Sequence, residues 1–109
     1  MLRILPITLA LGVLFLARSA YAQDPQAGQK VYTSQKCSVC HSIGGTGNKK
    51  GPLDGIGVKL SADQIRQWIT DAPAMTAKAN ATRKPAMKAY TLPKEELDGL
   101  VAYLASLKK

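Results

Sequence analysis

Apolar residues recur at helical spacing in three parts of this chain, and no stretch alternates with the period of two that a strand requires. The C-terminal stripe is the longest and comprises Leu97, Leu100, Val101, Leu104 and Leu107. Pro93 opens this segment, Glu95 and Glu96 fall in its first turn, and Lys108 and Lys109 close it, as the helix dipole favours. The pattern predicts a C-terminal helix.

The N-terminal stripe follows a clear start signal. Asp24 can accept hydrogen bonds from the first turn of a helix, and Pro25 suits the first helical position because it has no N–H to leave unpaired. Val31 lies at helical spacing behind them. We expect a helix from Pro25 to about Lys36.

The middle stripe is Ile65, Trp68 and Ile69, and it follows Ser61 and Gln64, which form a capping box. These residues predict a helix of about ten residues that ends near Ala72-Pro73.

Glycine, proline and other turn residues dominate residues 42–59, and residues 73–90 are polar, basic and interrupted by Pro85. Both segments are expected to be irregular. The glycine-rich one could be a flexible linker, or a loop that approaches a flat ligand closely because glycine has no Cβ. The prediction is an all-α domain of three to four helices joined by glycine-rich loops.

The first residues differ from the rest. Arg3 is followed by a mostly apolar run over residues 4–17 and by Ala20-Tyr21-Ala22, a small-x-small cleavage pattern. These are the parts of a secretory signal peptide. The run is shorter than the roughly 20 residues needed to cross a bilayer, which disfavours the alternative of an uncleaved anchor. We expect residues 1–22 to be removed, residues 23–109 to form one domain, and this domain to reside in the periplasm without stable membrane insertion.

Composition raises a packing problem for this domain. A chain of 109 residues with one Trp and one Phe can build only a marginal core, and two cysteines allow at most one disulfide. A further group should therefore fill the middle of the fold.

Cys37-Ser38-Val39-Cys40-His41 is the C-x-x-C-H signature of c-type haem attachment. Cys37 and Cys40 can form thioethers to the two haem vinyl groups, and His41 then lies under the iron as an axial ligand. Three alternatives fit less well. A redox dithiol of the thioredoxin type needs strands around it, zinc needs four ligands, and a disulfide across so short a loop stabilises little.

The second axial position separates electron transfer from ligand binding. His41 is the only histidine, so methionine is the remaining candidate, and the domain contains Met75 and Met87. Met87 lies in a polar stretch with no apolar stripe to join, so it is the predicted ligand, whereas Met75 is the lesser candidate.

With these motifs in place, the domain resembles a class I monohaem cytochrome c over nearly its whole length. The matching parts are the segment from Gly28 to His41, the Gly51-Pro52-Leu53 loop, the Met87 segment and the run from Leu100 to Leu104. The resemblance implies that the first and last helices cross at Gly28, with Tyr32 and Tyr103 nearby.

The resemblance also implies that the Pro52 carbonyl accepts from the imidazole of His41 and that the distal methionine is Met87. Trp68 is expected to pack against the haem, or else to donate a hydrogen bond to a propionate. The chain departs from the family pattern around Pro52 and after Met87, where many relatives have proline instead of Lys88.

The expected function is that of a monomeric, non-enzymatic electron carrier with one covalent haem c. Two alternatives stay open: an electron-transfer subunit of a larger periplasmic dehydrogenase, and a ligand-binding haem protein with a labile methionine. The formal net charge of +8 and the lysines near the motifs favour redox partners with acidic docking surfaces, although such lysines could also serve solubility alone. Nucleic acid is not expected as a partner, since the chain has no interleaved aromatic platform. The lysines concerned are Lys36, Lys49, Lys50, Lys59, Lys84 and Lys88.

Overall fold

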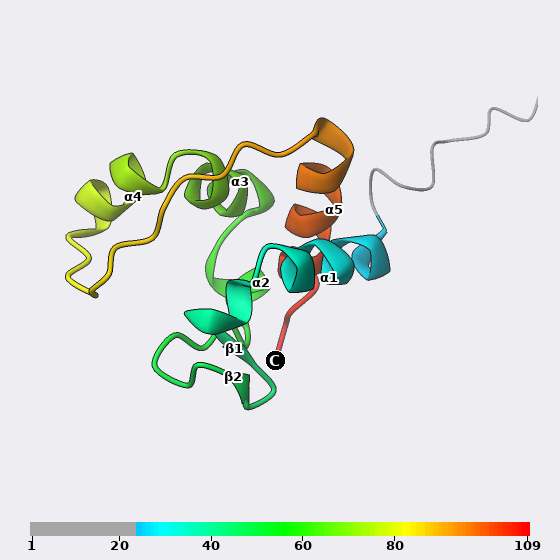
Figure 1. Cartoon of the computed structure of the whole chain (residues 1–109), viewed down its shortest axis with the longest axis horizontal. Coiled ribbons are helices and arrows are strands. Elements are labelled where there is room, and N and C mark those ends of the chain that lie inside the picture. The colour runs from blue at the N-terminus through cyan, green and yellow to red at the C-terminus, as the bar shows by residue number, and fades with distance from the viewer. Residues whose placement is uncertain (1–23) are drawn as a thin grey trace, which may run out of the picture.

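A computed structural model describes residues 24–109, so the leader expected over residues 1–22 lies outside the described residues. The described part is helical, with a two-stranded hairpin as its only sheet (Figure 1). Its elements in chain order are α1 (Pro25–Ser34), a 3₁₀ turn (Cys37–Val39), β1 (Ser42–Ile43), β2 (Thr46–Gly47), α2 (Ile56–Lys59), α3 (Ala62–Thr70), α4 (Ala72–Ala79) and α5 (Lys94–Ala105). The all-α prediction is confirmed. Within residues 24–109, no helix has both the length and the apolar character needed to span a bilayer.

The packing of α1 against α5 is the main contact between elements (Figure 1). The helices approach so closely at Gly28 that an added Cβ would overlap the carbonyl of Gly99. Tyr32 and Tyr103 lie beside this contact with their rings edge to face, 5.9 Å between centroids. The crossing at Gly28 is therefore confirmed, and absence of a side chain at this position is its physical cause.

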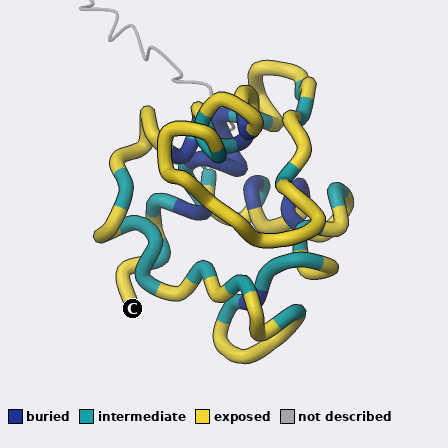
Figure 2. Tube along the Cα trace, turned by 90° about the vertical axis from the view of Figure 1, so that its left-hand side faces the viewer, coloured by how far each residue is buried: buried dark blue, intermediate teal, exposed yellow. Residues whose placement is uncertain are grey.

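The protein core lies between these two helices and α3. Buried residues concentrate where the helices meet, whereas most of the loops are exposed (Figure 2). The buried cluster consists of Val31, Tyr32, Ile65, Ile69, Leu100, Val101 and Leu104. The predicted stripes of all three helices thus contribute to one core.

Helix starts follow the sequence signals closely. The Asp24 carboxylate accepts from the backbone N–H of Gln26 at 2.9 Å. The capping box is complete, since Ser61 Oγ accepts from Gln64 N at 3.1 Å and Gln64 Oε1 accepts from Ser61 N at 2.9 Å. Helix ends were predicted less well: α1 ends at Ser34 rather than near Lys36.

The segment after α3 was predicted wrongly. We expected an irregular run from Pro73, but α4 occupies Ala72–Ala79. Pro73 lies in the first turn of this helix, where its missing N–H costs nothing, so the proline starts a helix instead of stopping one. The helix ends at Asn80, whose left-handed φ of 50° suits a C-cap.

The glycine-rich segment also contains more structure than predicted. Ser42 and Ile43 pair with Gly47 and Thr46 in an antiparallel hairpin, and α2 forms a single turn further on. Gly44 and Gly45 form the bend of the hairpin with positive φ values of 58° and 80°, a conformation that glycine adopts without strain. The segment is a shaped loop rather than a linker.

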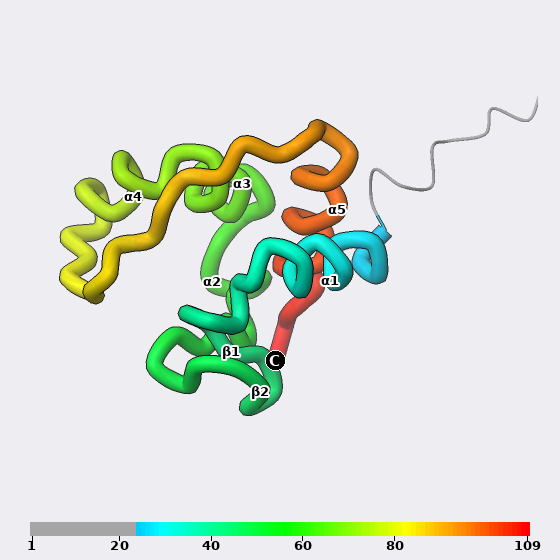
Figure 3. Tube along the Cα trace, in the orientation of Figure 1, coloured from blue at the N-terminus to red at the C-terminus, as the bar shows by residue number. Residues whose placement is uncertain are grey.

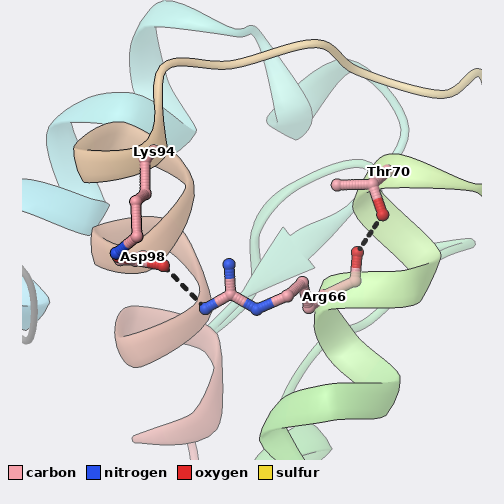
Figure 4. A network of polar contacts seen from close by, with 4 residues as sticks. All are labelled: Arg66, Thr70, Lys94 and Asp98. Atoms are coloured by element: carbon pink, nitrogen blue, oxygen red, sulfur yellow. Dashed lines mark hydrogen bonds and ion pairs between the residues drawn. The ribbon is translucent and has the colours of Figure 1, made fainter.

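A charged network connects α3 to α5 (Figure 4). Asp98 is 9% exposed, and its carboxylate accepts from Lys94 Nζ at 2.8 Å and from Arg66 Nη2 at 2.7 Å. The hydrogen bonds from Lys94 and Arg66 hold the pKa of Asp98 below its ordinary value. A buried carboxylate thus has a cationic partner from each helix.

Replacing Gly28 with alanine should lower the free energy of unfolding by about 2–3 kcal/mol, because the new methyl group collides with backbone of α5. Gly99→Ala is the matched control, since its added Cβ would lie 3.3 Å from the nearest atom, Gly28 N. Both changes gain similar helix propensity, up to ~1 kcal/mol. Urea unfolding should therefore give a clearly lower free energy of unfolding for Gly28→Ala than for Gly99→Ala. Equal values would show that the close contact at Gly28 does not require the absence of a side chain.

Asp98→Asn should lower the free energy of unfolding by about 1–3 kcal/mol at neutral pH. The folded-state pKa of Asp98 is depressed, so its stabilisation is present above the unfolded-state pKa of about 3.9 and disappears as the pH falls through the folded-state pKa. Thermal unfolding measured across this pH range should show the melting temperatures of the wild type and Asp98→Asn becoming equal in acid. A difference in melting temperature that persists unchanged at the lowest pH would show that the ionised Asp98 carboxylate is not the source of the stabilisation.

Candidate functional site

The C-x-x-C-H motif forms one compact turn directly after α1. Lys36 adopts a left-handed φ of 57° and redirects the chain, and the 3₁₀ turn Cys37–Val39 follows. The Cys37 carbonyl accepts from Cys40 N at 3.1 Å and from His41 N at 2.9 Å. The turn therefore holds two free, half-buried thiols and one half-buried imidazole within five residues.

The imidazole of His41 is oriented by a backbone carbonyl, as expected, but by a different one. His41 Nδ1 lies 3.0 Å from the carbonyl oxygen of Gly51, not that of Pro52. The register explains the shift: Ser42 N also donates to Gly51 O at 3.1 Å, while Ser42 O accepts from Leu53 N at 2.8 Å. This pairing turns the Gly51 carbonyl toward His41, so the prediction for Pro52 is corrected by one residue.

The hydrogen bond determines which nitrogen of His41 is available. A carbonyl can only accept, so Nδ1 carries the proton and Nε2 keeps its lone pair. Burial lowers the pKa of His41. The hydrogen bond to Gly51 opposes this effect and the nearby Arg83 charge adds to it, so that the net lowering favours the neutral imidazole. Burial also raises the pKa of the Cys37 thiol. The site offers a neutral nitrogen ligand, and burial keeps the Cys37 thiol beside it in the protonated form.

Asn48, one of the turn residues within the glycine-rich segment, has a structural role at the site. Its backbone N–H lies 2.9 Å from the carbonyl of His41 and 3.1 Å from that of Ser38. Its side-chain Nδ2 donates to the carbonyl of Val39 at 3.1 Å. These hydrogen bonds hold the end of the hairpin against the C-x-x-C-H turn. An asparagine seven residues after the histidine carries no motif, so only the fold reveals this role.

Met87 lies in residues 80–93, which contain no helix or strand (Figure 3). Its side chain is half-buried, whereas Ala86 and Lys88 are exposed. Earlier in the segment, Arg83 contacts Gly51. Burial, and then the proximity of both cysteines, raises the pKa of Tyr90 later in the segment. Met87 is thus flanked by two residues that lie near the turn.

Two further residues named as candidates from the sequence, Met75 and Trp68, lie on helices outside the C-x-x-C-H turn and its loops. Met75 is half-buried in α4. Trp68 is half-buried on α3 and is not among the side chains that pack on the protein's own core cluster. Its contact with a haem stays a prediction.

The described residues fit a large apolar group at this site. Cys37 and Cys40 are both free, and no large side chain of residues 24–109 is fully buried. The Tyr32 hydroxyl is buried without a hydrogen-bond partner in this part of the chain, and burial raises its pKa to about 12. A haem has the vinyl groups that thiols bond to, an apolar ring, and propionates that accept hydrogen bonds.

A small helical domain with a C-x-x-C-H turn and a carbonyl-oriented histidine defines the class of c-type haem proteins. The chain belongs to the cytochrome c family, since the model of that family, described as Cytochrome c, matches residues 25–108. Its architecture is that of a class I c-type cytochrome. Family membership assigns haem-based electron transfer to this chain.

One relative extends this comparison. The chain is 31% identical over 105 residues to cytochrome c oxidase subunit 2 of Alkalihalophilus pseudofirmus. The match covers 83% of this chain but only 29% of that subunit, so the chain spans less than a third of the relative's length. No solved structure matches the chain with significance.

Asn48→Ala should lower the free energy of unfolding by about 1–2 kcal/mol, because the carbonyl of Val39 loses its side-chain donor and Lys50 N loses its acceptor, Asn48 Oδ1. Denaturant unfolding of the haem-loaded protein measures this loss. Thr46→Ala, on the same hairpin and exposed, is the control. Equal stability of the two variants would show that Asn48 does not hold the turn.

Proposed function

We propose that this chain carries single electrons between proteins of the periplasm, with one haem attached covalently through Cys37 and Cys40. His41 and Met87 are the axial ligands in this proposal. The haem, when bound, supplies the one-electron couple. The chain supplies its attachment, its orientation and its exclusion from bulk water.

The observation that carries the proposal is the geometry of the C-x-x-C-H turn. One turn presents both free thiols together with an imidazole whose Nδ1 is occupied by Gly51, at 3.0 Å. Nε2 is thereby left for a metal, and the fixed ring cannot rotate away from it. Such an arrangement suits electron transfer because it keeps the ligand in the same place in both oxidation states.

Support for Met87 as second ligand comes from its segment. Met87 is half-buried and lies in sequence between Arg83, which contacts Gly51, and Tyr90, whose pKa is raised by burial and by both cysteines. Met75, by contrast, is fixed within α4. A methionine ligand stabilises the reduced iron and raises the potential.

Partners with acidic surfaces follow from the charge around the turn. The lysines of the C-x-x-C-H turn and of the adjacent hairpin are exposed and have no ion-pair partner within residues 24–109; they are Lys36, Lys49 and Lys50. Val39, between the cysteines, is 66% exposed. An apolar residue within a basic rim is suited to brief, electrostatically guided docking. The periplasmic location rests on the signal-peptide pattern of residues 1–22.

A second candidate function is an electron-transfer subunit within a larger redox assembly. The similarity to an oxidase subunit favours it, since 83% of this chain matches less than a third of that subunit. The same haem site serves both functions. Co-purification with a larger redox enzyme would distinguish this candidate from the free carrier.

Met87→Ala should convert a six-coordinate, low-spin haem protein into one that binds added ligands, because the thioether is removed. Visible absorption spectra of the purified ferric protein measure this change directly. The iron–sulfur charge-transfer band should be present in the wild type and absent in the variant.

Met75→Ala is the control and should retain the band. A high-spin wild-type spectrum that Met87→Ala leaves unchanged would instead indicate an open distal position, and hence ligand binding. Protein without haem from a host competent in cytochrome maturation would refute the proposal altogether.

A further inference from the structure

The segment that carries Met87 has few anchors of its own. From Thr82 to Leu92, the only backbone–backbone hydrogen bond within the described residues runs from Tyr90 N to Ile69 O, at 2.8 Å. This bond fixes the end of the segment near α3 and α5 (Figure 3). The part before Met87 needs another attachment if the thioether is to stay in one place.

Arg83 provides such an attachment. Its guanidinium lies against Gly51, so closely that a Cβ on Gly51 would overlap Nη1 and lie 3.0 Å from Cζ. Gly51 is the residue whose carbonyl accepts from His41 Nδ1.

No carboxylate of residues 24–109 forms an ion pair with Arg83 that would explain its position. The ion pairs within residues 24–109 connect Asp98 with Arg66 and Lys94, and neither involves Arg83. The side chain is exposed overall, yet its head group contacts the glycine of the histidine loop. A planar guanidinium can pack flat on a backbone that has no Cβ, and a lysine ammonium cannot do so equally well.

We infer that Arg83 is a positioning residue that clamps the Met87 segment onto the loop that orients His41. This inference rests on the proposed ligation by Met87. Arg83 lies four residues before Met87 and the Tyr90 bond three residues after it, so the thioether is held from both sides. Loss of the clamp leaves the ligand in place on average but lets it dissociate more readily.

A competing explanation is that Arg83 acts only through its charge near the site. A charge effect would change the reduction potential, and removal of any nearby cation would have a similar effect. A clamp should instead change how easily a neutral ligand displaces Met87. Imidazole, studied above its own pKa, is such a ligand.

The test is an imidazole titration of the ferric holoprotein, followed through loss of the iron–sulfur charge-transfer band. Arg83→Gln should bind imidazole about two- to fivefold more tightly than the wild type, as befits an exposed contact. Arg83→Lys should recover part of the difference. Lys84→Gln removes a neighbouring charge but keeps the Arg83 guanidinium on Gly51, and it should match the wild type.

Three results would overturn the inference. Unchanged imidazole affinity in Arg83→Gln, with the band lost in Met87→Ala, would refute the clamp while leaving Met87 as ligand. Equal effects of Arg83→Gln and Lys84→Gln would assign the effect to charge alone. A wild-type spectrum that Met87→Ala does not alter would refute the proposed ligation, and the clamp with it.

Discussion

The close approach of α1 and α5 at Gly28 is the contact on which the rest of the structure depends. α1 leads straight into the C-x-x-C-H turn, and α5 follows directly after the Met87 segment. Their packing therefore links the two parts of the chain from which the axial ligands are proposed to come. The Gly28 backbone meets that of Gly99, and the Asp98 network ties α3 to the same helix. The frame thus combines one close glycine contact, one buried carboxylate and the apolar core between α1, α3 and α5.

On this frame, the site is built from loops whose geometry is set by backbone hydrogen bonds. The Gly51 carbonyl receives both Ser42 N and His41 Nδ1, while Asn48 binds the turn from the hairpin side. The described core is small and contains no large, fully buried side chain. A covalently held apolar group would therefore serve stability as well as electron transfer, since a domain of this size has little else to bury.

Local signals in the sequence predicted the starts of α1, α3 and α5, the helical core stripes and the C-x-x-C-H turn, because capping and periodicity are encoded within a few residues. They failed at a residue that is compatible with either end of a helix, and at contacts between residues distant in sequence. Pro73 was interpreted as a helix stop and is a helix start. The carbonyl acceptor of His41 is Gly51 rather than Pro52, and the roles of Asn48 and Arg83 depend on loop register and on contacts distant in sequence. Such features follow from the fold and not from any short motif.

The proposed electron transfer depends on covalent attachment of one haem to Cys37 and Cys40. The most direct test of this attachment is the intact mass, under denaturing conditions, of protein produced in a host that matures c-type cytochromes. Covalent attachment predicts the mass of residues 23–109 plus one haem, and no such addition when both cysteines are replaced by serine. A mass equal to the polypeptide alone, from the wild-type chain in that host, would contradict it.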